Sequence, residues 1–373
     1  MEDRIVCEGS RCTGCMACVE LCPKKAIAIQ DTVKAYNAVI DVRKCVDCGL
    51  CYSICQNNQE VKTVPPIKTY QGWIQDTKLR EKSSSGGAAM ALSQNVIMQG
   101  GAVCSCVFEN GEFRLEFVET IEGLQSFTGS KYVKSNPYGV YRELTARLKR
   151  GQQVLFIGLP CQVAAVKNVT KEVNHNLYTV DLICHGTPSP RLLDDFLSQK
   201  GINMQDIKNI QFRRKDMFGV SNDSIPMAEP GTCDLYSLAF LCSLIYTDNC
   251  YQCKYASLNR PSDLTIGDSW GSQLSQEELK KGVSLILCQT EKGKDLLDST
   301  EMYLTEVDLE RAVQNNAQLR APADKSKLHD RFFKKYKKGR FCEAVFYAFP
   351  FKCVKQRIKA ILIRMRIIRG WGI

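Results

Sequence analysis

The sequence predicts a mixed α/β protein, with α+β character, preceded by a small cysteine-rich domain and followed by a basic amphipathic helical tail. Two runs of four cysteines lie before residue 60, and helical and strand-like periodicities alternate from there to about residue 320. Lys and Arg then accumulate after residue 330. We expect four segments: a cysteine-rich domain at 1–62, a proline-containing linker at 63–75, an α/β domain at 76–320 and the tail at 321–373.

The two cysteine runs share one spacing. Cysteines stand at positions 12, 15, 18 and 22 in the first run, and at 45, 48, 51 and 55 in the second. Three cysteines of such a run bind one 4Fe–4S cluster, and the fourth reaches the neighbouring cluster. A zinc site would use two pairs of cysteines, and disulfides would suit a short secreted chain. We predict one cluster on Cys12, Cys15, Cys18 and Cys55, and a second on Cys45, Cys48, Cys51 and Cys22.

The segment around these cysteines resembles a bacterial two-cluster ferredoxin. Its apolar stretches at residues 26–29 and 39–41 are placed to pair as strands between the cluster loops. Pro23 follows the first run, whereas Gln56 follows the second, which removes a rigid turn but no ligand. A unit of this size buries too small a core to be stable alone, so the clusters would add the missing stability.

The α/β domain is predicted from periodicity. Helical spacing favours helices at residues 88–99, 138–149 and 309–318. Strand-like runs lie at residues 102–108, 112–119, 153–157, 177–183, 263–266 and 283–289. Asn110-Gly111 joins the first two strands as a hairpin. No dinucleotide-binding glycine motif and no phosphate loop of the Walker type occurs, and three histidines leave little material for a Ser-His-Asp relay.

Four motifs in this domain carry a second resemblance. They are Gly158-Leu159-Pro160-Cys161-Gln162, Cys184-His185-Gly186, Cys250-x-x-Cys253 and the stretch from Arg260 to Asp268. On this ordered set, residues from about 80 to 320 resemble the beta subunit of coenzyme F420-reducing hydrogenases and dehydrogenases. The resemblance implies an iron–sulfur flavoprotein oxidoreductase in which FAD lies beside a 4Fe–4S cluster.

The resemblance implies a third cluster on Cys161, Cys184, Cys250 and Cys253. A cysteine at a helix entrance, such as Cys161, favours the thiolate form. Alternatively, Cys161 and Cys184 are small buried residues, and the Cys250/Cys253 pair binds zinc or nothing. The sequence departs from the family where Asp181-Leu182-Ile183-Cys184 stands in place of a Gly-Leu-Phe-Cys stretch. The other eight cysteines have no ligand spacing and are expected to be incidental thiols.

For FAD, the resemblance points to two loops. They comprise Ser84, Ser85, Gly86 and Gly87, and Gly129, Ser130, Lys131 and Tyr132. A Ser/Gly-rich loop that opens a helix offers backbone N–H groups to a pyrophosphate, although an ordinary capped turn has the same composition. Lys131 would pair with a phosphate or remain a solvated charge.

Charge separates the tail from the rest of the chain. Residues 331–373 hold thirteen Lys or Arg and one Glu, a net charge of +12, whereas the whole chain carries +10, which leaves −2 for residues 1–330. Apolar residues at spacings of three and four predict a helix suited to an anionic membrane surface, or one that packs on the body or a partner. Nucleic acid is not an expected partner, because the body has no basic face.

The expected function is that of an oxidoreductase. Electrons would come from a protein donor such as ferredoxin, pass through the clusters to FAD, and reduce an unidentified organic acceptor. The alternative is a non-catalytic electron-transfer subunit that relays electrons to a partner enzyme at the membrane surface. Twenty cysteines without a recognisable signal peptide indicate a cytoplasmic protein, with the tail at the inner membrane face.

Overall fold

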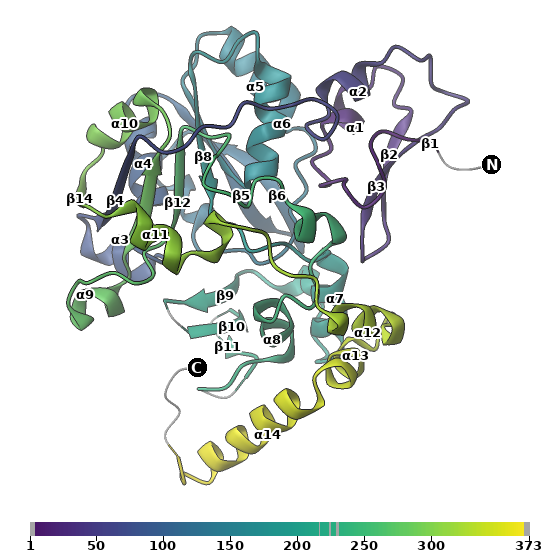
Figure 1. Ribbon diagram of the computed structural model, residues 1–373, viewed down its shortest axis with the longest axis vertical. Helices are drawn as coiled ribbons and strands as arrows, with labels where there is room; N and C mark the ends of the chain where they lie inside the picture. The colour runs from purple at the N-terminus through teal and green to yellow at the C-terminus, as the bar shows by residue number, and fades with distance from the viewer. Residues whose placement is uncertain (1–3, 216, 224, 229–230, 369–373) are drawn as a thin grey trace.

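The computed structural model describes residues 4–215, 217–223, 225–228 and 231–368. Its centre is an eight-stranded mixed sheet with helices on both faces (Figure 1). In spatial order, the strands are β14 (Met302–Glu306), β4 (Lys68–Ile74), β13 (Ser284–Cys288), β12 (Leu264–Asp268), β8 (Leu177–Leu182), β7 (Val154–Gly158), β5 (Ala102–Glu109) and β6 (Glu112–Val118). The predicted mixed α/β class is confirmed.

The parallel part of the sheet positions the candidate site. Strands β5, β7, β8 and β12 run parallel to their neighbours in that group, and antiparallel strands extend both sides of it. Because parallel strands end at the same edge, the loops after β7 and β8 lie side by side there. The predicted linker needs correcting, because residues Lys68–Ile74 form β4 between β13 and β14 rather than a connector.

Two helical layers bury the sheet. Val103 and Leu155 contact the core under α4 (Ala88–Met98) and α10 (Glu291–Asp298), whereas Cys104 and Phe156 contact the opposite core. This alternation follows from the two-residue period of a strand. The second layer consists of α5 (Val140–Lys149) and α6 (Pro160–Thr170), with α11 (Leu309–Asn315) over β13.

The N-terminal unit packs on the α5/α6 layer. It has a three-stranded sheet in the order β1 (Arg4–Ile5), β3 (Tyr36–Ile40) and β2 (Ile27–Asp31), with helices α1 (Ala17–Leu21) and α2 (Leu50–Ile54). The buried carboxylate of Glu20 accepts hydrogen bonds from the N–H groups of Gly139 at 2.8 Å and Arg142 at 2.7 Å. A carboxylate at a helix N-terminus is favourable, so Glu20 ties this unit to the start of α5.

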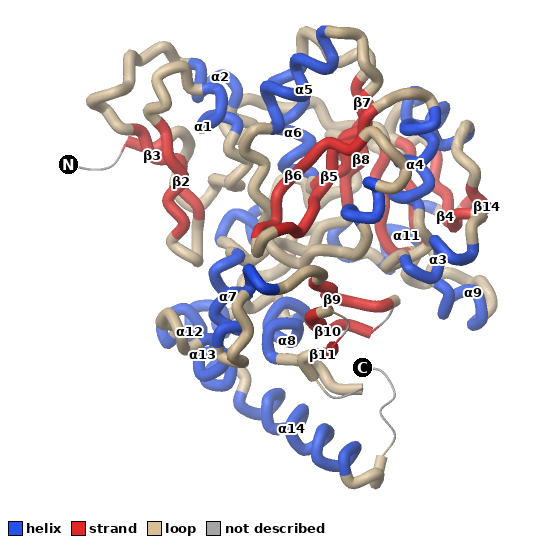
Figure 2. Tube along the Cα trace, turned by 180° about the vertical axis from the view of Figure 1, so that it is seen from behind, coloured by secondary structure: helices blue, strands red, loops and turns tan. Residues whose placement is uncertain are grey.

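A smaller lobe lies below the central sheet (Figure 2). It contains a sheet of β9 (Ile210–Arg214), β10 (Met217–Asn222) and β11 (Ile225–Pro226), with helices α7 (Pro190–Ser198), α8 (Leu235–Leu241), α12 (Lys327–Lys335) and α13 (Phe341–Ala348). Phe332 of α12 and Phe341 of α13 are fully buried against Phe196 and Tyr236. Much of the range expected to form a tail is therefore part of a core, and α14 (Pro350–Arg364) extends beyond it.

Short helices complete the described chain. They are α3 (Thr77–Lys82), α9 (Gln276–Lys281), η1 (Gly123–Phe127), η2 (Met204–Asp206), η3 (Asp248–Gln252) and η4 (Ala317–Leu319). None of the described helices is both long enough and apolar enough to cross a membrane.

The packing of α13 gives a test with a matched pair of phenylalanines. Phe341 is 0 % exposed, and Phe351, ten residues later, is 90 % exposed. Phe341→Ala should reduce the free energy of unfolding by about 3–5 kcal/mol, because it leaves a cavity in the core. Phe351→Ala should change it by no more than about 0.5 kcal/mol. Urea unfolding of the anaerobically purified protein measures both, and equal effects would contradict the described packing.

Candidate functional site

The two cysteine loops of the N-terminal unit repeat one backbone conformation. In each loop, the residues two and four positions after the first cysteine have positive φ, namely Gly14 and Met16 in the first loop and Asp47 and Gly49 in the second. Such left-handed residues turn the chain sharply. The repeat lets successive thiols of a loop face a common centre, as a cluster loop requires.

Cys22, Cys45, Cys48 and Cys51 line one cavity beneath Ile27 and Ile40. Cys22 comes from the end of α1, and the other three surround the start of α2. Cys48 is exposed, and Cys45 and Cys51 are partly exposed. This cavity, which contains the cysteines predicted for the second cluster, therefore lies at the surface of the molecule.

Cys12, Cys15, Cys18 and Cys55 form the deeper group. Burial raises the pKa of Cys15 to about 12, with further contributions from the nearby Cys12 and Cys55. A fifth thiol, that of Cys7, is within hydrogen-bonding reach of Cys12 and Cys55; it lowers their pKa values to about 7 and about 6, and its own pKa is raised. No sequence pattern indicated that Cys7 lies here, because it stands outside the repeated spacing.

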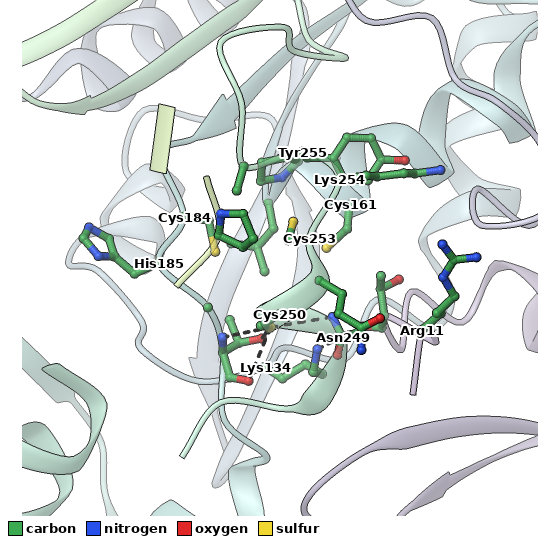
Figure 3. A pocket seen from close by; sticks show the side chains of 18 of the residues that line it. Arg11, Lys134, Cys161, Cys184, His185, Asn249, Cys250, Cys253, Lys254 and Tyr255 are labelled. Atoms are coloured by element: carbon green, nitrogen blue, oxygen red, sulfur yellow. Dashed lines mark hydrogen bonds between the residues drawn. The ribbon is translucent and has the colours of Figure 1, made fainter. Parts of the chain in front are cut away.

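Cys161, Cys184, Cys250 and Cys253 line a second cavity (Figure 3). Cys161 lies in the first turn of α6, which follows β7, and Cys184 lies after β8. Cys250 is part of η3, and Cys253 directly follows it. The N–H of Thr187 donates to Sγ of Cys250 at 3.4 Å. Burial raises the pKa of Cys184 to about 12, and it also raises the pKa of Cys161 well above the ordinary value. Cofactor ligation would have to offset this cost of forming thiolates.

Two buried cations line the same cavity. Arg260 is 1 % exposed, and its Nε and one terminal nitrogen have no hydrogen-bond partner within the described chain. Lys134 is also buried, and its Nζ donates to the carbonyl of Thr13 at 3.1 Å. The other terminal nitrogen of Arg260 donates to the carbonyl of Tyr255 at 2.7 Å, and the guanidinium opposes the rise in pKa that burial causes at the nearby Asp181. Four cysteines with these cations beside them fit an anionic iron–sulfur cluster held by thiolates.

The described residues contain no group of three or more His, Cys, Asp or Glu side chains arranged for a single metal ion. A four-iron cluster holds its thiolates on separate irons, whereas a lone zinc ion holds all of its sulfur ligands at about 2.3 Å.

A hydrogen-bonded wall separates the deeper cysteine group from this cavity. The buried Gln56 donates from Nε2 to Thr13 Oγ1 at 3.2 Å and accepts from the hydroxyl of Tyr255 at 2.5 Å. Tyr255 lies near cysteines of both groups, since Cys161, Cys253, Cys15 and Cys55 all contribute to its raised pKa. Thus Gln56, which replaces the proline expected after Cys55, links the two units.

The two loops predicted for FAD meet each other. Ser84 Oγ accepts a hydrogen bond from the N–H of Ser130 at 3.0 Å, and Gly87 begins α4 without a side-chain cap. The N–H groups of the first turn of α4 are consequently available to an anion, which fits a pyrophosphate. Lys131 instead donates to the carbonyls of Phe127 and Thr128, both at 2.9 Å, and burial lowers its pKa to about 8.

Several polar groups beside these loops were not predicted from the sequence. Nζ of Lys215 donates to the carbonyl of Ser85 at 3.1 Å. The pKa of Lys215 is lowered to about 8, mainly by burial and to a smaller extent by the positive charges of Arg80 and Arg213. Arg213 forms a partly buried ion pair with Asp268 at 2.6 Å. The fourth residue of the second predicted loop, Tyr132, stacks on Phe240 with 4.5 Å between ring centroids. In the sequence, the signal that could have indicated these polar groups is the run of three basic residues Arg213-Arg214-Lys215.

Comparisons with known proteins agree with this geometry in two segments. Residues 11–58 match the family model of the 4Fe-4S dicluster domain, and residues 151–311 match that of the C terminus of the coenzyme F420 hydrogenase/dehydrogenase beta subunit. No curated protein matches the chain. A solved structure described as the xenon derivatization of the F420-reducing NiFe hydrogenase complex from Methanosarcina barkeri aligns with 16 % identity over 74 % of this chain and 96 % of that one. Its TM-score of 0.45 is too low to define the fold.

The two matches define an iron–sulfur protein with a role in electron transfer. The match of residues 151–311 to the C terminus of the coenzyme F420 hydrogenase/dehydrogenase beta subunit confirms the resemblance found in the motifs.

Iron content tests the cysteine groups. Three 4Fe–4S clusters would give about twelve irons per chain in anaerobically purified protein. Cys250→Ser combined with Cys253→Ser should remove about four, because two of four thiolates are lost, whereas Cys342→Ser in α13 should remove none. Iron and sulfide assays measure this. About eight irons in the parent, unchanged in the double variant, would exclude the third cluster.

Proposed function

We propose that this chain is an iron–sulfur flavoprotein oxidoreductase that takes electrons from a donor protein such as ferredoxin and delivers them to an organic acceptor. When bound, the iron–sulfur clusters would store single electrons, and FAD would combine two of them for transfer to the acceptor. The ligands would be the eight cysteines of the N-terminal unit and the set of Cys161, Cys184, Cys250 and Cys253.

The observation that carries this proposal is the wall shared by the deeper cysteine group of the N-terminal unit and the cavity of Cys161. Arg11, Thr13 and Asn57 of the N-terminal unit line the cavity of Cys161 together with residues of the α/β domain. Tyr255 and Gln56 exclude water from the boundary because both are buried. The exposed Cys48 lies at the other end of the N-terminal unit, where a donor protein has access.

The α/β domain supports the flavin half of the proposal through the loop at Ser84–Gly87. The uncapped start of α4 provides N–H groups and the positive end of a helix dipole toward a pyrophosphate. Lys215 and Arg80 lie nearby, but the ammonium of Lys215 donates to the carbonyls of Arg80 and Ser85, and Arg80 is paired with Glu278. Lys131 would not serve this role in the described arrangement, because its ammonium is bound by backbone carbonyls.

One feature of the same loop favours the alternative, an electron-transfer subunit without flavin. The N–H of Gly86 donates to Ser284 Oγ at 3.1 Å, and a Cβ added at Gly86 would lie 2.4 Å from the carbonyl oxygen of Gly72. Contacts within the chain therefore account for a glycine at position 86 without a bound pyrophosphate. A relay subunit would need the cysteine-lined cavities and the exposed Cys48, but no pyrophosphate site.

Ala89→Asp distinguishes the two functions with little effect on folding. Ala89 is partly exposed in the first turn of α4, where a carboxylate stabilises the helix but repels a phosphate. The affinity for FAD should fall by about tenfold or more, whereas Ala89→Asn should bind FAD like the parent. The flavin released on denaturation and FAD titration measure this.

Equal FAD affinity in both variants would remove this helix start from the site. A parent that holds its iron but binds no FAD would favour the relay function.

A further inference from the structure

Helix α14 has a buried face, an exposed apolar face and basic residues between the two on both sides. Cys353, Gln356, Ala360 and Ile363 lie at spacings of three and four residues and form the more buried face. Cys353 is 1 % exposed, and Gln356 Oε1 accepts a hydrogen bond from the N–H of Cys233 at 3.2 Å. Lys352 adds a contact to Cys242 at 3.0 Å. The helix is thus fixed to the smaller lobe along this face, and Figure 1 shows that it extends along the edge of the molecule.

The opposite face is apolar and exposed. Its residues, again spaced by three and four, are Phe351, Val354, Ile358, Ile361 and Met365, and they are between 42 % and 90 % exposed. Isolated exposed apolar residues are common on protein surfaces, but a continuous stripe of five on one helix marks an interaction surface.

Positive charge borders this stripe on both sides. Residues 350–368 contain six Lys or Arg and no Asp or Glu. By the period of an α-helix, Lys352, Lys355 and Lys359 lie along one side of the stripe, and Arg357 and Arg364 lie along the other. Arg357 also stacks over Phe346 of α13, at 5.4 Å from the ring centroid, which holds that border against the lobe.

We propose that α14 binds an anionic lipid surface and lies in the plane of the membrane interface. The apolar stripe enters the boundary between headgroups and acyl chains, and the two basic borders lie at the level of anionic headgroups. A second copy of this chain fits the surface poorly, because pairing two stripes would bring two sets of six cations together. The fixed opposite face keeps the stripe turned outward, so the helix needs no rearrangement to bind.

Both cysteine-lined cavities lie in the body of the protein, and no residue of α14 lines either of them. The contacts of α14 are to the lobe of α8 and α13, whereas Cys48 lies on the N-terminal unit, on another part of the molecule (Figure 1). Membrane attachment is therefore compatible with access of a donor protein, and it rests on α14 whether or not the proposed function is correct.

Vesicle binding by the full, iron-loaded chain tests the proposal. Sedimentation with phosphatidylcholine vesicles should show strong binding when they contain phosphatidylglycerol and much weaker binding when they do not. Ile358→Glu combined with Ile361→Glu should weaken binding by about tenfold or more, because two apolar side chains leave the interface. Met98→Glu places the same change on an exposed residue of α4 and should have no effect.

The basic border is tested separately. Lys355→Gln should weaken binding to the anionic vesicles about fivefold, whereas Lys171→Gln and Lys280→Gln, at exposed positions elsewhere, should not. Raising the salt concentration to 1 M, where the screening length is about 3 Å, should release most of the bound protein. These variants keep the apolar stripe, and an unchanged iron content shows that they fold.

Three outcomes would overturn the proposal. The first is equal binding of the parent to neutral and anionic vesicles, and the second is full binding by the Ile358→Glu/Ile361→Glu variant. The third is a parent protein that does not bind vesicles but is a dimer in solution, together with a variant that is a monomer. The last outcome would assign the stripe to a second copy of the chain, and light scattering after size exclusion detects it.

Discussion

Gln56 of the N-terminal unit accepts a hydrogen bond from Tyr255 of the α/β domain, and its amide is oriented by a second bond to Thr13 of its own unit. Separating the units would leave the buried amide oxygen of Gln56 unpaired and would expose Lys134, whose ammonium binds the Thr13 carbonyl. Glu20 adds a second attachment at the start of α5. The two cysteine-rich regions are consequently held beside each other, and a fixed separation is what electron transfer between them would require.

The charged side chains near the third cysteine group are consistent with this placement of the two units. Lys134 and Arg260 are buried cations that line the cavity of the third cysteine group, and Arg260 keeps two nitrogens without partners in the described chain. Burial raises the pKa values of Cys161 and Cys184, which disfavours their thiolates unless a positive charge or an iron atom compensates. Cations and thiols therefore make sense together as the environment of one anionic group. The loops predicted for FAD lie beside another cation, Lys215, whose ammonium donates to the carbonyls of Arg80 and Ser85.

Local patterns predicted much of this structure. Cysteine spacing placed Cys22, Cys45, Cys48 and Cys51 in one group, and the structure has all four line one cavity, since a loop's geometry is determined by neighbouring residues. Periodicity found the central strands and α4, but β4 was mistaken for a linker, because its place in the sheet depends on pairing with β13 and β14, distant in sequence. Contacts such as that of Gln56 with Tyr255 depend on the docking of two units, and no local pattern encodes that. The burial of Phe332 among basic residues was hidden for the same reason.

A redox titration of the Lys134→Met variant, followed by electron paramagnetic resonance, tests the central claim that one wall serves two cysteine groups. The charge of Lys134 acts on Cys12 on one side and on Cys161 on the other. Because reduction adds negative charge, removing the ammonium should lower the midpoint potentials of both sites together, by on the order of 50–100 mV. Lys171→Met, at an exposed position, is the control. A shift confined to one site, or no shift at either, would contradict the account.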